Sequence, residues 1–238
     1  MTSRSIYGSA QVEKNVREKI KEFAETRQDI DEITKSRVLG WAEGYADALE
    51  KDRMRVEGEA RDQTIRTIRH EGGHQLLFEF GIHAKDTRQG AWLVEGLATF
   101  CEPQEIGDVH EFRLMELKFN LEKYHLMPLE YLLSFAAGGD IHKLEPSYTS
   151  MAYAQSWAFV HFLMSGSYRN GFLTYVREVS KQGKDFDEKK DLDLLVKHLG
   201  KSIQELDKEF TIYVNKLIKE HIDPKRYEDF RFRMLMAL

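Results

Sequence analysis

The chain has 238 residues, of which 42% are hydrophobic and 32% are charged, and its formal net charge is −5. This composition is that of a globular protein, and the length fits one domain or one domain with an appendage. The negative charge gives no general attraction to nucleic acid or to an anionic membrane, and no apolar run is long enough to span a bilayer.

The N-terminal sequence and the cysteine content bear on the compartment. The first residues lack the apolar core of a signal peptide, so we expect a cytoplasmic protein unless the chain is part of a longer one. Cys101 is the only cysteine, which excludes an internal disulfide bond. It lies among apolar residues, and we interpret it as a packing residue rather than a nucleophile.

Residues 1–64 are strongly charged and carry apolar residues at helical spacing. This spacing predicts two or three helices, which either pack over the helix that follows or form an arm. The stripes include Val12, Val16, Ile20, Phe23, Ile30, Ile33, Val38, Trp41 and Tyr45. We therefore divide the chain into a charged helical N-terminal segment, 1–64, and a second part, 65–238.

The next predicted helix begins near Ile65 and ends at Gly81, because glycine favours the position just past a helix C-terminus. Asp62 or Thr64 is its expected N-cap. Its expected core face is formed by Ile65, Ile68, Leu76 and Leu77.

This helix carries an H-E-x-x-H motif at residues 70–74. Residues four apart share a helix face, so His70 and His74 can direct both imidazoles at one metal ion. Zinc binds nitrogen and carboxylate ligands, and a catalytic zinc site keeps one position open for water. Glu71 lies one step round the helix, where its carboxylate is placed to accept a proton from that water.

A catalytic zinc site needs a third protein ligand, and Glu95 is the candidate. A polar loop, residues 85–90, allows the chain to return, and a second helix is predicted to begin near Ala91. Its other side chains are mostly apolar. A carboxylate in such a helix needs a partner, because an unpaired buried charge is costly, and zinc would be that partner.

The two motifs together resemble those of the gluzincins, zinc metallopeptidases whose third ligand is a glutamate on a second helix. The run W-L-V-E-G-L-A at residues 92–98 looks like the corresponding element of aminopeptidase-type and peptidase-MA-like members, including uncharacterised bacterial ones. The resemblance implies a zincin-like fold and one zinc per chain, held by His70, His74 and Glu95, with Glu71 as general base. Val94 stands where many members carry asparagine.

Two residues on the second helix are candidates for accepting hydrogen bonds from the ligand histidines. Thr99 and Glu102 lie four and seven residues beyond Glu95, on the same helix face. Ligand histidines usually donate their other N–H group to a carboxylate or a carbonyl. Either Glu102 or Thr99 can accept that hydrogen bond, and for Glu102 the alternative is a surface acid.

The remaining features near the motif are open to two interpretations each. Gly72 and Gly73 each cost roughly 1 kcal/mol in a helix, so they indicate either close approach of substrate or backbone, or tight packing on the second helix. His83 is interpreted as a loop histidine, with a fourth metal ligand as the alternative. Three further histidines are expected to be structural or exposed, namely His110, His125 and His161.

Further helices are predicted downstream, at residues 111–125, 128–135 and from 151, the last capped by Ser150. The resemblance implies that a tyrosine at the start of this last helix supports the oxyanion, which indicates Tyr153, with Tyr148 as the runner-up. The alternative is a tyrosine that only packs. Ser202 and Glu205 predict a capping box for the last long helix, which Pro224 ends.

These features predict a mainly α domain, with a small sheet possible, of zincin-like type with helical N-terminal and C-terminal parts. The expected function is zinc-dependent hydrolysis of a peptide or amide bond in a peptide or protein substrate. The alternatives are a non-hydrolytic binding or scaffold protein stabilised by zinc, and a zinc hydrolase acting on a non-peptide amide. The sequence leaves the oligomeric state open.

Overall fold

The computed structural model describes residues 14–15, 17–23, 25–27, 31–83, 89–135, 144–181 and 187–236. These residues are mainly helical, as the sequence predicts, and among them only Gly90 has a β-bridge. The chain divides into two compact units, Met1–Ile65 and Arg66–Leu238. Within the described part of the chain, no helix combines the length and the apolar character that a bilayer crossing requires.

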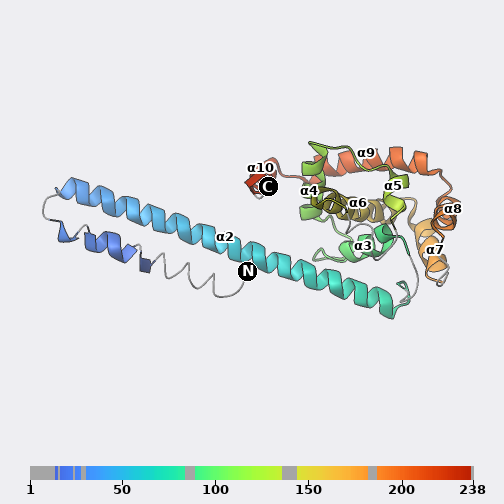
Figure 1. Ribbon diagram of the computed structural model, residues 1–238, viewed down its shortest axis with the longest axis horizontal. Helices are drawn as coiled ribbons and strands as arrows, with labels where there is room; N and C mark the ends of the chain where they lie inside the picture. The colour runs from blue at the N-terminus through green and yellow to red at the C-terminus, as the bar shows by residue number, and fades with distance from the viewer. Residues whose placement is uncertain are drawn as a thin grey trace. The chain divides into compact units, whose positions relative to one another are not determined.

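The first unit contains the N-terminal part of α2 (Glu32–Glu79) and the helical residues described between 14 and 26 (Figure 1). Arg17 forms an ion pair with Asp47 of α2, with 2.9 Å between Nη2 and Oδ1. Ala42 and Ala46 are buried. The unit therefore contains a helical pair, in agreement with the helical pattern of residues 1–64.

Helix α2 begins at Glu32, far earlier than the predicted caps allow, so the prediction of a helix start at Asp62 or Thr64 is wrong. Its N-terminus is capped instead by Asp31, whose carboxylate accepts a hydrogen bond from the backbone N–H of Thr34 at 2.8 Å. No proline interrupts residues 31–79, and ion pairs such as Arg53–Glu57 support the middle of the helix.

The second unit contains the C-terminal part of α2 and a group of shorter helices. These are α3 (Ala91–Phe100), α4 (Glu111–Leu121), α5 (Leu129–Leu133), α6 (Pro146–Ser165), α7 (Arg169–Val179), α8 (Glu188–Leu199), α9 (Ile203–His221) and α10 (Pro224–Met236).

Helix α6 is the centre of this unit, and α3, α4, α7 and α9 all pack against it (Figure 1). Its buried side chains include Trp157, Phe159 and Leu163. The helix begins at Pro146, so the predicted cap at Ser150 is wrong. Proline suits the first turn of a helix because the missing N–H has no partner there, which explains the earlier start.

Helix α3, which carries Glu95, is held against α6 by a glycine. A Cβ atom at Gly96 would lie 2.8 Å from the Ser156 carbonyl oxygen and 2.8 Å from Val160 Cγ2. Trp92 is fully buried beside Phe159 on the same side of α3. The absence of a side chain at residue 96 thus lets the helix with the acidic residue sit directly on the core.

Several predicted helix ends agree with the structure. Gly81, the predicted end of the helix that carries the motif, follows α2 with φ of 66°, a left-handed conformation that glycine adopts without strain. Gly200 follows α8 in the same conformation, with φ of 67°. Ser202 and Glu205 form the predicted capping box of α9. Most of the polar loop predicted at residues 85–90 lies outside the described residues.

Candidate metal centre

The two helices that carry the motifs pack closely because of Gly73. A Cβ atom at this position would lie 3.2 Å from Cys101 Cβ and 3.4 Å from both the Ala98 Cα and carbonyl oxygen. Gly72 has nothing within 4 Å of such an atom. Of the two interpretations, helix packing therefore applies to Gly73, while Gly72 borders open space.

The face of α2 that meets α3 differs from the predicted one. Ile65, Ile68 and Leu76 are exposed, so the prediction that they form the core face is wrong. Gly73 is buried, and His70 and His74 are half-buried. The side of α2 that carries His70 and His74 is therefore its inner side. Ile65, Ile68 and Leu76 lie on the opposite side of the helix, as the period of 3.6 residues per turn requires.

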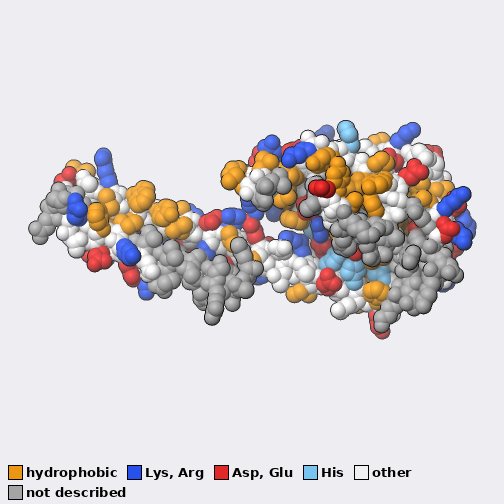
Figure 2. All heavy atoms as spheres, viewed as in Figure 1, with side chains coloured by type: hydrophobic (Ala, Val, Ile, Leu, Met, Phe, Trp, Pro, Cys, Tyr) orange, Lys and Arg blue, Asp and Glu red, His pale blue; other side chains and the backbone are white. Residues whose placement is uncertain are grey.

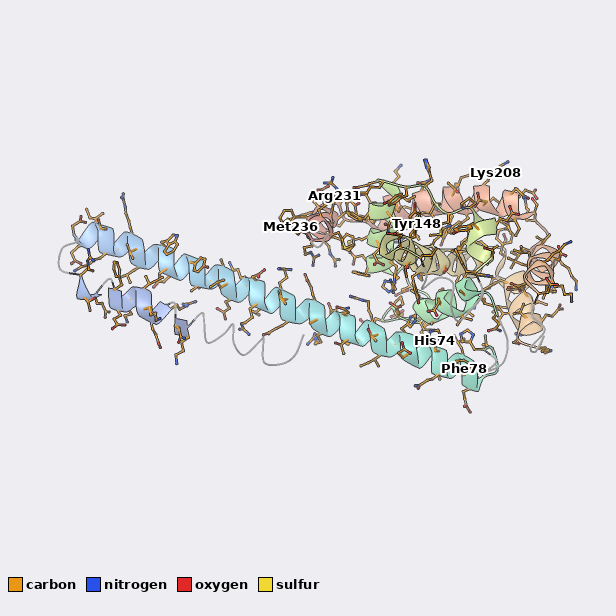
Figure 3. All side chains as sticks on the ribbon, in the orientation of Figure 1. His74, Phe78, Tyr148, Lys208, Arg231 and Met236 are labelled. Atoms are coloured by element: carbon orange, nitrogen blue, oxygen red, sulfur yellow. The ribbon has the colours of Figure 1, made fainter. Side chains whose placement is uncertain are left out.

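The structure brings His70, His74 and Glu95 together. The Nε2 atoms of the two histidines are 3.1 Å apart, and Glu95 Oε2 lies 3.2 Å from His70 Nε2 and 3.6 Å from His74 Nε2. The three residues form a group that can hold a metal ion. Figure 3 shows His74 on the side of α2 near α3, and Figure 2 shows histidine side chains gathered on this face of the second unit.

These three distances fit the dimensions of a tetrahedral zinc site. With zinc bonds of about 2.0–2.1 Å, ligand atoms at tetrahedral angles are roughly 3.3 Å apart. The donor set, two imidazole nitrogens and a carboxylate oxygen, is also one that zinc accepts, and it leaves a fourth position free. The residues present therefore fit a catalytic type of zinc site.

Hydrogen bonds between the histidines and the carboxylates hold the three candidate ligands together. Burial opposes charge on His70, but its hydrogen bonds to Glu102 and Glu95 outweigh burial and raise the pKa of His70 to about 9. Burial also opposes charge on Glu95, yet its bonds with His70 and His74 lower the pKa of Glu95 to about 2. The carboxylate is thus ionised throughout the neutral range.

Of the two candidates behind the ligands, Glu102 contacts a histidine. His70 Nδ1 donates a hydrogen bond to Glu102 Oε1 at 2.9 Å, so Nε2 is the ring nitrogen of His70 that faces His74 and Glu95 and that can bind a metal once it has lost its proton. Glu102 is only 3% exposed, so it is not a surface acid. Thr99 is buried, and its hydroxyl has no hydrogen-bond partner among the described residues.

Glu71 and Tyr153 lie beside the three donors. Glu71 is exposed on α2, next to His70. The ring of Tyr153, on α6, lies 6.5 Å from that of His70, measured between centroids. Burial, followed by the negative charge of Glu95, raises the pKa of Tyr153 well above its usual value, so its hydroxyl keeps its proton. The negative charge of Glu71 also contributes to this shift.

The runner-up, Tyr148, has other surroundings. It is 40% exposed, and its ring contacts that of Tyr124 in a tilted arrangement, with 5.4 Å between the centroids. Figure 3 labels Tyr148 near the first turn of α6, apart from the label of His74 on α2.

The remaining histidines are placed as follows. His83 is buried and its Nδ1 lies 3.2 Å from Gln89 Oε1, while its ring centroid is 5.7 Å from that of His74. It is not among the residues that form the metal-binding group. His161 is buried with Tyr213 as a partner of Nδ1, and His125 is exposed.

His110 is the residue that sequence reasoning missed. It is 5% exposed, and its Nε2 lies 2.6 Å from Glu102 Oε2. No spacing rule connects it to the motif, because an irregular segment separates it from α3. The only signal in the sequence was its position just before a helix, where a side chain can act as the N-cap.

A comparison with protein-family models gives one result for this region. The model described as "Protein of unknown function (DUF1570)" matches residues 64–185, just over half of the chain. The chain belongs to this family. All residues of the candidate metal centre lie inside the DUF1570 match. No curated protein and no solved structure matches the chain.

Proposed function

We propose that this member of the DUF1570 family hydrolyses peptide or amide bonds with the help of one zinc ion. The observation that carries the proposal is the convergence of His70, His74 and Glu95, whose donor atoms are 3.1–3.6 Å apart. The sequence resemblance to gluzincins independently favours the same three ligands. Bound zinc would supply Lewis acidity, which makes water more acidic and a carbonyl group more electrophilic.

The chain's own residues would handle the protons. Glu71, exposed beside His70, accepts a proton from water as the water oxygen attacks the carbonyl carbon. When the carbon–nitrogen bond breaks, Glu71 passes this proton to the leaving nitrogen. Tyr153, which stays protonated, donates its O–H group to the developing oxyanion.

Metal content gives the first test. We expect one zinc per chain, measured by mass spectrometry of protein purified without added metal. His74→Ala should abolish zinc retention, because two ligands remain of three. The matched control is His125→Ala, which removes an exposed histidine and should keep the metal. A wild-type protein that binds no zinc when supplied with it would overturn the proposal.

Turnover on a peptide library gives the second test. Glu71→Gln should retain zinc but lose cleavage, because the amide cannot accept the proton. Glu79→Gln changes another exposed acid on the same helix and serves as the control. Unchanged cleavage by Glu71→Gln would reject the proposed role of Glu71.

The second candidate is a binding or scaffold protein that zinc stabilises without hydrolysis. One observation favours it: the donors join α2 to α3, so a bound metal would tie these helices together. This candidate predicts zinc binding and a large zinc-dependent rise in melting temperature, with no cleavage of any peptide or non-peptide amide.

A further inference from the structure

Glu102 is a buried carboxylate with a different partner on each oxygen. Oε1 accepts the hydrogen bond from His70 Nδ1 at 2.9 Å, and Oε2 lies 2.6 Å from His110 Nε2. The guanidinium of Arg113 adds a contact of 3.6 Å to Oε1. These partners come from α2 and from the start of α4, so Glu102, which follows α3, links these two helices.

The direction of the His110 hydrogen bond follows from its second nitrogen. His110 is the N-cap of α4, and its Nδ1 accepts the backbone N–H of Arg113 at 3.3 Å. Nδ1 must therefore carry a lone pair, which places the proton on Nε2 in the neutral ring. His110 Nε2–H then donates to Glu102 Oε2.

His110 is also held by packing. Its side chain is 5% exposed, and its ring meets that of Trp157 edge-on, with 5.9 Å between the centroids. A donor that is fixed by a helix N-terminus on one side and by a core tryptophan on the other has little freedom. It can therefore fix the orientation of the carboxylate that it contacts.

We propose that His110 is a positioning residue of the metal centre and acts through Glu102. By holding Oε2, it turns Oε1 towards His70 Nδ1 and thereby keeps His70 Nε2 directed at His74 and Glu95. The inference rests on the proposed zinc site. It adds His110 behind Glu102, so that a chain of hydrogen bonds runs from His110 at the start of α4 through Glu102 to His70 on α2. The alternative is a helix cap and core residue without influence on the ligands.

The test measures zinc affinity of the full chain by competition with a chromogenic chelator. His110→Phe keeps the ring volume and removes the donor. We expect it to weaken zinc binding by about 10-fold to 100-fold, the range for residues that orient ligands. His110→Gln, whose amide N–H can reach the carboxylate, should recover part of this loss.

A matched control comes from a second histidine–glutamate pair. His198 Nε2 lies 3.0 Å from Glu178 Oε2, on α8 and α7. We expect His198→Phe, the same substitution outside the centre, to leave the zinc dissociation constant unchanged. Equal weakening by His110→Phe and His198→Phe would overturn the inference, because the effect would then be a general loss of packing.

A double-mutant cycle separates action through Glu102 from a direct effect. In the background of Glu102→Gln, His110→Phe should change zinc affinity much less than in the wild type. Full additivity overturns the inference, as does a His110→Phe protein that binds zinc as tightly as the wild type. A wild type that binds no zinc is a different result, because it overturns the proposed function itself. If His110→Phe does not fold, His110→Gln and the same cycle decide the question.

Discussion

Two carboxylates seven residues apart, Glu95 and Glu102, have different surroundings. Glu95 lies on α3, whereas Glu102 follows the end of α3 at Phe100, so the prediction that Glu102 belongs to this helix is wrong. Glu95 meets the Nε2 atoms of both motif histidines, whereas Glu102 meets Nδ1 of one of them. In the proposed site the first carboxylate would be a metal donor, and the second would hold His70 through Nδ1 so that Nε2 is left for the metal. Their positions relative to the histidine rings decide these roles.

At the scale of single residues, Tyr153 gives a sharp prediction. We expect Tyr153→Phe to lower kcat by about 10²-fold to 10³-fold, because a donor to the oxyanion is lost. The zinc content should stay at the wild-type level, since the hydroxyl is not a ligand in the proposed site. Peptide cleavage assays and metal analysis measure the two quantities.

The control for this prediction is Tyr148→Phe. Tyr148 is exposed and its ring contacts that of Tyr124, so we expect wild-type activity. Full activity of Tyr153→Phe, or loss of activity only in Tyr148→Phe, would assign the oxyanion donor elsewhere.

Single residues also show which parts of the candidate site the sequence predicts and which it does not. Helical periodicity is enough to bring His70 and His74 to one face, and one loop length is enough to propose Glu95. His110 reaches Glu102 across an irregular segment whose path depends on contacts such as that with Trp157. Spacing along the chain carries no information about such a path.

At the scale of helices, the two adjacent glycines of the motif have opposite expected effects. Gly73→Ala would place its Cβ at 3.2 Å from Cys101 Cβ, so α2 and α3 must move apart by a few tenths of an ångström. We expect weaker zinc binding, because the histidines and Glu95 lie on different helices. Gly72→Ala meets no atom within 4 Å and should stabilise the fold by up to about 1 kcal/mol through helix propensity.

Urea denaturation and zinc titration of both variants give the comparison, and each variant serves as the control for the other. A Gly72→Ala protein that loses more zinc affinity than Gly73→Ala would contradict the packing argument. It would indicate instead that the open side of α2 must stay free for another reason.

The α7–α8 pair offers a pH-dependent test. Asp191 of α8 is buried and accepts a hydrogen bond from Tyr175 of α7 at 2.7 Å. Burial outweighs this bond and raises the pKa of Asp191 to about 6. An acid with a higher pKa in the folded state destabilises the fold once it ionises, so its contribution worsens as the pH rises from about 4 to 6.

We therefore expect Asp191→Asn to raise the melting temperature at pH 8, with a smaller gain at pH 4. The amide can still accept the tyrosine hydrogen bond but carries no charge. Asp193→Asn, an exposed neighbour on the same helix, should change little at either pH. An equal gain for Asp191→Asn at both pH values would show that its ionisation is not the cause.

Helix ends separate what local sequence determines from what it does not. Gly81 and the Ser202–Glu205 box act within one turn, and their predicted positions are correct. The start of α2 was mispredicted because Asp62 and Thr64 are good N-caps only where the preceding chain is not already helical. Capping residues show where a helix can begin, but not that it does so.

At the scale of the whole molecule, the core and the candidate centre belong to the second unit. The main cluster of buried hydrophobic residues runs from Ala91 to Leu217, and the three candidate metal ligands lie between His70 and Glu95. The DUF1570 match begins at residue 64, close to the division of the chain after Ile65. The residues needed for a metal site and for a core are therefore contained in one continuous part of the sequence.

This distribution predicts that a chain of residues 61–238 folds and binds zinc with the dissociation constant of the full chain. A start at Arg61 leaves more than two helical turns before His70, so fraying of the new helix end stops short of the ligand. Circular dichroism and chelator competition measure folding and affinity. A chain of residues 72–238 lacks His70 and serves as the contrast, since it should fold but lose zinc. Loss of zinc binding by the 61–238 chain would mean that the N-terminal segment contributes to the centre.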